Sequence, residues 1–124
     1  MTRPKWCIVQ LKLPNAENVV LPESKFTKYL FAGDYAEGLA KGKAISSRLG
    51  YDINNWKAFS NVIKESAAKY PVIIKANDQY GTKYEQKIVV YGFKEMPANV
   101  IVGWIHRPNG EVSMTSTYIK EVKI

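Results

Sequence analysis

The spacing of apolar residues changes near residue 70, and this change limits the folds open to the chain. Before it, apolar residues recur every three or four positions; Trp56, Phe59 and Ile63 line one stripe, and Pro71 follows the end of the segment. That period is typical of helices. After it, apolar and polar residues alternate, as over residues 84–90, and this is the period of a strand. The pattern predicts a helical part over residues 22–70 and an antiparallel sheet over residues 72–122.

Three helices and four strands are expected. The helices are predicted within residues 21–31, 35–50 and 54–70, and the strands within residues 72–76, 82–93, 99–107 and 111–122. Asn109 and Gly110 join the last two strands, and an Asn-Gly pair favours a tight hairpin. Short connections of this kind join antiparallel neighbours. The predicted fold is α+β, with three N-terminal helices packed on a four-stranded antiparallel sheet. A single domain is expected over residues 1–124, with residues 1–12 as a short extra strand.

The composition indicates a basic protein whose charge is not confined to a tail. The net charge is +7, and nine of the 18 Lys and Arg residues lie in residues 1–62 and nine in residues 63–124. Such a surface favours polyanions, either RNA or an acidic protein partner, although a solvated lysine-rich surface explains the same charge. The N-terminus does not resemble a signal peptide, and no apolar run is long enough for a membrane span. We therefore expect a cytoplasmic protein that does not bind membranes.

Several kinds of chemistry lack a sequence signal. The single cysteine, Cys7, excludes an internal disulfide and a multi-cysteine zinc site. Phosphate-loop and dinucleotide motifs are absent from the sequence, and its carboxylates do not have the spacing of a metal-binding loop. Neither a metal ion nor a small-molecule cofactor is expected. RNA cleavage through the 2′-hydroxyl remains open, because it needs only a base, an acid and a cation near the phosphorus.

Groups suited to that reaction occur on the expected strands and on the second helix. The catalytic candidates are Lys83, Tyr84, His106, Ser116 and Tyr118. Glu85 and Thr117 are further groups of the same kind on these strands. The candidates for substrate binding are Lys41, Lys43, Tyr80 and Arg107. Tyrosines beside lysines on a sheet suit base stacking next to phosphate contacts.

Each candidate also has a purely structural interpretation. His106 shares a strand face with Trp104, so it fits a packed and hydrogen-bonded side chain, whereas Arg107 lies on the other face. Tyr84 and the Ser-Thr-Tyr run at residues 116–118 are ordinary strand residues. Lys41 and Lys43 fit a solvated helix face unless that face borders a cleft.

The segment "LPNAE", Leu13 to Glu17, resembles the opening of an uncharacterised family of small bacterial domains. The resemblance continues at Lys25–Leu30, at Lys43-Ala44 with residues 49–51, and at Trp56, Tyr80–Glu85 and Trp104. A final strand at residues 116–118 is similar to the family's "TAYP" pattern. More remotely, helices followed by such a sheet are similar to nuclease toxins of the barnase, EndoU, colicin and RelE-like type. This second resemblance implies RNA cleavage without metal. The family pattern has no histidine at position 106, which moves attention to Lys43, Lys83, Tyr84 and Tyr118.

The leading hypothesis is therefore a nuclease-toxin domain that cleaves RNA without a metal ion. Lys43 and Lys83 would hold phosphate, Ser116 and Tyr118 would shape the scissile site together with Tyr84, and His106 would be an additional acid or base. The alternative is a non-enzymatic binding module, an immunity-like, antitoxin-like or accessory protein with an acidic protein or nucleic-acid partner.

Overall fold

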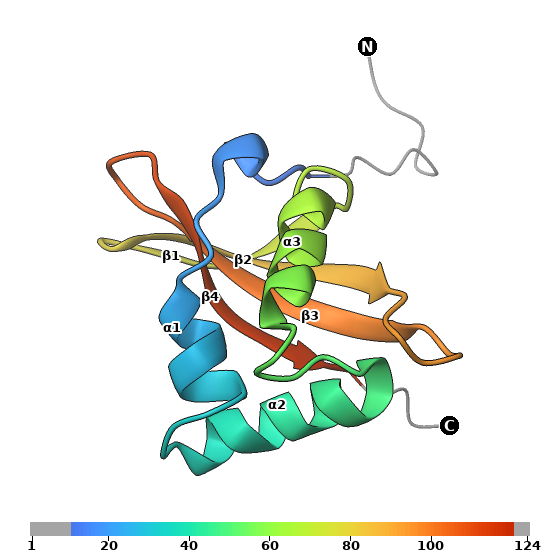
Figure 1. Ribbon diagram of the computed structural model, residues 1–124. Coiled ribbons are helices and arrows are strands. Elements are labelled where there is room, and N and C mark those ends of the chain that lie inside the picture. The colour runs from blue at the N-terminus through green and yellow to red at the C-terminus, as the bar shows by residue number, and fades with distance from the viewer. Residues whose placement is uncertain (1–10, 121–124) are drawn as a thin grey trace.

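A computed structural model describes residues 11–120, in which helical segments are followed by a four-stranded sheet (Figure 1). The helical segments are η1 (Ala16–Asn18), α1 (Glu23–Lys25), η2 (Phe26–Leu30), α2 (Ala36–Leu49) and α3 (Trp56–Ser66). The strands are β1 (Val72–Asp78), β2 (Gly81–Val90), β3 (Ala98–His106) and β4 (Val112–Ile119). Each strand pairs antiparallel with the next, in the order β1-β2-β3-β4. The α+β class is thus confirmed, with three helices and a four-stranded antiparallel sheet.

The local signals of the sequence form the elements that they predict. In α3 the stripe residues Phe59 and Ile63 are fully buried. At the last hairpin Gly110 has a φ of 93°, which glycine adopts without strain. Its N–H donates to the Arg107 carbonyl over 2.9 Å. The hairpin fixes the register of β3 against β4.

The first predicted helix differs from its expected form. Its α-helical part is three residues long, and it continues as the wider π-helical turn η2, in which the Phe31 N–H donates to the Phe26 carbonyl over 3.0 Å. The wider turn buries both Phe26 and Leu30, and the Phe26 ring stacks on Trp56 with centroids 5.4 Å apart. Tertiary packing has overridden the local helical period at this segment.

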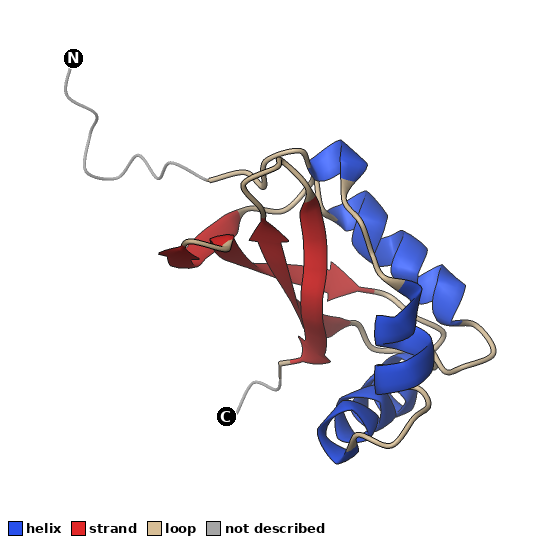
Figure 2. Ribbon diagram, turned by 90° about the vertical axis from the view of Figure 1, so that its left-hand side faces the viewer, coloured by secondary structure: helices blue, strands red, loops and turns tan. Residues whose placement is uncertain are grey.

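The helices lie on one side of the sheet (Figure 2). The strand residues that face them, among them Ile88, Val100 and Trp104, are fully buried. Gln86 belongs to this buried face and joins the sheet to α3. Its side-chain amide donates to the carbonyl of Ala67, just after α3, over 3.0 Å, and its oxygen accepts from the Trp104 indole over 3.1 Å. This face holds the core of the protein.

Helix α2 lies unusually close to the preceding turn because two of its residues are glycines. A Cβ on Gly38 would come within 2.7 Å of the Tyr29 ring, and one on Gly42 would collide with the Leu30 carbonyl. The two glycines lower helix propensity. In return they let α2 pack directly on η2, which brings Lys41 next to Tyr29.

The outer strands make short contacts with the N-terminal segment. Leu11 forms an antiparallel bridge with Val72 at β1, and Val20 forms a parallel bridge with Ser113 at β4. The extra strand expected over residues 1–12 falls mostly on residues 1–10, which lie outside the described residues. The last strand, expected over residues 111–122, covers Val112–Ile119, and residues 121 and 122 lie outside the described residues.

Candidate functional site

The face of the sheet turned away from the helices, here called the open face, carries three of the predicted catalytic residues. Lys83 precedes Tyr84 on β2, and the strand alternation turns their side chains to opposite faces. Ser116 pairs with Gly103, and Tyr118 pairs with Ile101. Lys83, Ser116 and Tyr118 therefore lie on the open face.

Tyr84 and His106 lie on the helix-side face, so the sheet separates them from the other three catalytic candidates. Tyr84 pairs with Trp104, and His106 pairs with Thr82 on one side and Val112 on the other. His106 is half-buried at the end of β3. Its place beside the core agrees with the structural interpretation of this residue.

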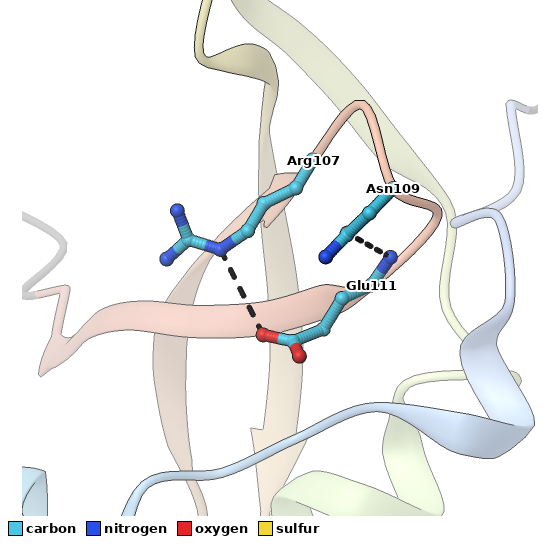
Figure 3. Close-up of polar contacts among 3 residues, drawn as sticks. All are labelled: Arg107, Asn109 and Glu111. Carbon is cyan, nitrogen blue, oxygen red and sulfur yellow. Dashed lines mark hydrogen bonds and ion pairs between the residues drawn. The ribbon is translucent and has the colours of Figure 1, made fainter.

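Arg107 stabilises the last turn. Its side chain makes an ion pair with Glu111, with Nε and Oε1 3.7 Å apart (Figure 3). Its backbone N–H donates to the Glu111 carbonyl over 2.8 Å. The Asn109 side chain accepts from the Glu111 N–H over 3.0 Å. Tyr80 lies at the β1–β2 turn and is largely exposed. Neither Arg107 nor Tyr80 lies near the middle of the open face.

A hollow of about 390 Å³ lies on the open face of the sheet. Its walls include Ile73 and Ile101, and three charged side chains line it: Glu85, Lys87 and Lys120. Within residues 11–120, the Glu85 carboxylate makes no ion pair within 4.0 Å and accepts no hydrogen bond. One carboxylate that is not neutralised by a fixed partner thus shares a concave surface with two ammonium groups.

Two hydroxyl groups lie beside the hollow, above Gly103. Gly103 pairs with Glu85 on one side and Ser116 on the other, so these three residues form one row across the sheet. A Cβ on Gly103 would be 2.8 Å from Thr115 Oγ1 and 2.9 Å from Ser116 Oγ. The missing side chain therefore leaves room for both hydroxyls.

A β-bulge in β4 turns Ser116 and Tyr118 toward the open face. Gly103 pairs with Ser116 but Trp104 pairs with Met114, so Thr115 is an extra residue in the strand. One extra residue reverses the faces of all residues that follow it. Without the bulge, Tyr118 would point toward the helices.

Lys41 approaches the same region from α2. Its ammonium nitrogen is 5.7 Å from the centroid of the Tyr118 ring, so the structure brings one predicted binding residue to one predicted catalytic residue. Lys43 is exposed and lines a different hollow, of about 330 Å³, together with Leu39, Asp52 and Ile53. Lys41 therefore borders the open face, whereas Lys43 does not share its hollow.

Three residues of this region were not candidates from the sequence: Lys87 and Lys120, which line the hollow, and Thr115, whose hydroxyl lies above Gly103. Glu85 was already one of the sequence groups suited to this chemistry. A signal for Lys87 was present, because Lys83, Glu85 and Lys87 alternate along one strand and must share a face. The role of Thr115 depends on the bulge, which has no clear sequence signal. Chemically, the set offers a base, cations for an anionic substrate and two hydroxyl donors.

The same fold and sequence pattern occur in other proteins. The family described as "Domain of unknown function (DUF6883)" matches residues 12–121. The chain belongs to the DUF6883 family. A solved structure with a similar fold is a contact-dependent growth inhibition toxin–immunity protein complex from Klebsiella pneumoniae 342, with a TM-score of 0.63 and 21% sequence identity. That match covers 82% of this DUF6883 chain and 99% of the other. A search of curated proteins found no match.

Two features are absent from the described part of this DUF6883 domain. None of its helices has the length and apolar character needed to cross a bilayer. Across residues 11–120, no three His, Cys, Asp or Glu side chains lie close enough together to hold a metal ion.

Proposed function

We propose that this DUF6883 chain is a toxin domain that cleaves RNA through the 2′-hydroxyl, and that the reaction takes place on the open face of the sheet. The observation that carries the proposal is the hollow that Glu85 shares with Lys87 and Lys120, beside the hydroxyls of Thr115 and Ser116. A base, cations and hydroxyl donors on a rigid sheet are what this reaction requires.

In the proposed reaction, Glu85 accepts the proton of the 2′-hydroxyl. The 2′-oxygen attacks the adjacent phosphorus, the bond from phosphorus to the 5′-oxygen breaks, and the ammonium group of Lys87 or Lys120 gives a proton to the leaving 5′-oxygen. The products are a 2′,3′-cyclic phosphate and a 5′-hydroxyl. The second ammonium group and the hydroxyls of Thr115 and Ser116 stabilise the charge that develops on the phosphoryl oxygens.

Two further observations support a toxin role. The net charge of +7 favours an RNA substrate. A chain in a contact-dependent growth inhibition toxin–immunity protein complex has a similar fold. At 21% identity this likeness concerns the fold alone, and it is compatible with either the toxin or the immunity role.

The test is to incubate the purified protein with single-stranded RNA in the presence of EDTA and to analyse the product ends. We expect Glu85→Gln to lower the cleavage rate by about 100-fold, because general acid–base catalysis contributes about that much or more. Glu65→Gln is the matched control, since Glu65 is an exposed glutamate on α3.

A second pair of variants tests the cations. We expect Lys87→Ala to slow cleavage, whereas Lys64→Ala, at an exposed lysine of α3, leaves it unchanged. Thermal unfolding shows whether each variant is folded. An unchanged rate in a folded Glu85→Gln protein, or no cleavage by the wild type at micromolar concentration, contradicts the proposal.

A binding module is the second candidate, and the surface of β1 favours it. Ile73 and Ile74 are more than half exposed on this outer strand, where a protein partner could add a strand of its own. Co-expression with the acidic product of a neighbouring gene, followed by size-exclusion chromatography, tests this role. A complex that Ile74→Lys disrupts, formed by a protein that cleaves no RNA, would favour the binding module over the nuclease.

A further inference from the structure

A cluster of tyrosines and lysines lies where α2 meets β4, at the border of the open face. Two lysines approach the Tyr29 ring: the ammonium nitrogen of Lys25 is 5.8 Å and that of Lys41 is 5.7 Å from its centroid. Lys41 is also 5.7 Å from the centroid of Tyr118. One lysine thus lies between an aromatic ring of the helical part and one of the sheet.

The position of Lys41 is held by its neighbours. Its ammonium group makes an ion pair of 3.3 Å with Glu37, one helical turn earlier, and only a quarter of the Lys41 side chain is exposed. Gly38 allows this arrangement because a side chain there would overlap the Tyr29 ring. A lysine held between two rings has a restrained ammonium group, so it loses less conformational freedom on binding a phosphate group than a mobile surface lysine does.

Tyr35 adds an aromatic surface that is open to solvent. Its ring centroid is 5.9 Å from that of Tyr29, and the residue is 66% exposed. Nothing in the core requires a tyrosine at this position, since Tyr35 precedes α2 and does not belong to the buried cluster. Tyr35 thus borders Tyr29, the ring that the ammonium groups of Lys25 and Lys41 approach. An exposed ring in such surroundings is a surface on which a nucleic-acid base stacks while its phosphate contacts the lysines.

Tyr118 connects this cluster with the hollow. It pairs with Ile101, which lines the hollow, while its ring lies beside Lys41. We propose that Tyr35, Lys25 and Lys41 form a second binding site, for an unpaired nucleotide of the RNA strand that flanks the scissile phosphate. The strand passes from the hollow over Tyr118 to this site. The inference rests on the proposed RNA-cleaving function and defines its substrate as single-stranded.

The experiment measures binding of a fluorescently labelled single-stranded RNA of about ten nucleotides, a length that several subsites can span. All proteins carry Glu85→Gln so that the RNA remains intact. We expect Tyr35→Ala to weaken binding about tenfold and Tyr35→Trp to retain it, because any aromatic ring can stack on a base. Tyr91→Ala is the matched control at another exposed tyrosine, 75% exposed, and its effect should remain within about twofold.

The results separate the two proposals. If the wild-type protein cleaves RNA but Tyr35→Ala binds as tightly as Tyr91→Ala, the second site is wrong and the proposed function stands. If the wild type neither cleaves nor binds RNA, the proposed function fails, and the second site fails with it. Equal loss of binding in Tyr35→Ala and Tyr35→Trp also contradicts stacking. A duplex of the same sequence should bind more weakly than the single strand, and equal binding would overturn the assignment to unpaired nucleotides.

Discussion

Replacing Gln86 by leucine should be among the most destabilising single changes on the helix-side face. Gln86 is fully buried, and its side chain makes three hydrogen bonds: to the Ala67 carbonyl over 3.0 Å, to the Tyr70 carbonyl over 2.8 Å and from the Trp104 indole over 3.1 Å. Leucine is similar in size but cannot form any of them. The substitution therefore removes the polar link between β2, β3 and the end of α3.

The magnitude follows from what is left without a partner. The Trp104 indole N–H and the Ala67 carbonyl belong to buried residues, and each would cost about 2 kcal/mol when unpaired. The Tyr70 carbonyl is partly accessible, so its loss costs about 1 kcal/mol. The greater apolar character of leucine recovers about 1 kcal/mol. The free energy of unfolding should fall by about 4 kcal/mol, a large part of the stability of a typical domain.

Urea unfolding followed by tryptophan fluorescence measures this loss, and Gln79→Leu, in the exposed β1–β2 turn, is the control. A double-mutant cycle with Trp104→Phe isolates one hydrogen bond, because phenylalanine removes the donor that Gln86→Leu leaves unpaired. The two changes should cost at least about 1 kcal/mol less together than the sum of their separate costs. A loss below about 1 kcal/mol for Gln86→Leu, or a cycle without coupling, would refute the reasoning.

Three further predictions follow from individual side chains. Gly103→Ala should displace the hydroxyls of Thr115 and Ser116 and slow RNA cleavage in a protein that thermal unfolding shows to be folded. Asn99→Ala is the control on the same strand and face, and an equally slow reaction in that protein would contradict the prediction. Thr117→Val should raise the free energy of unfolding by about 1 kcal/mol in urea titrations, because the buried Thr117 hydroxyl has no hydrogen-bond partner within residues 11–120. Burial raises the pKa of the Tyr51 hydroxyl above its usual value of about 10, so the unfolded chain loses this proton first and stability should fall as the pH rises above about 10. The Tyr51→Phe protein should show a smaller fall over that range in the same titrations.

The parts of the fold that were predictable from the sequence are those governed by local patterns. The apolar stripe of α3 and the alternation along β2 and β3 determine which side chains are buried, and Asn109-Gly110 determines the last turn. These signals lie within a few residues of the structure that they specify. For that reason the class and the pairing order of the strands were accessible without coordinates.

The candidate site depends on events that local patterns do not encode. Simple alternation along β4 would place Tyr118 on the same face as Met114, which is buried toward the helices. The extra residue Thr115 reverses this and brings Ser116 and Tyr118 to the open face. A bulge depends on the fit of one strand to its neighbour, so it could not be predicted from β4 alone.

The contact between Lys41 and Tyr118 also depends on packing between distant parts of the chain. These residues are far apart in the sequence, and their contact depends on the close packing of α2 on η2 that Gly38 permits. In the sequence, this glycine only weakens the predicted helix. In the structure, it permits the close packing that brings Lys41 to Tyr118, whereas Lys43, two residues further along α2, lines a separate hollow.

The two faces of the sheet also explain why His106, although it is the one histidine in the chain, is a weaker candidate than Glu85. A base for RNA cleavage must reach the 2′-hydroxyl beside the phosphate that the cations hold. The register turns His106 toward the helices, while Lys87 and Lys120 line a hollow on the open face. Glu85 shares that hollow, and its row across the sheet leads over Gly103 to Ser116. Residue type alone favours the histidine, whereas shared geometry favours the glutamate. Because acid–base catalysis requires contact within hydrogen-bond distance, we assign the base of the proposed reaction to Glu85.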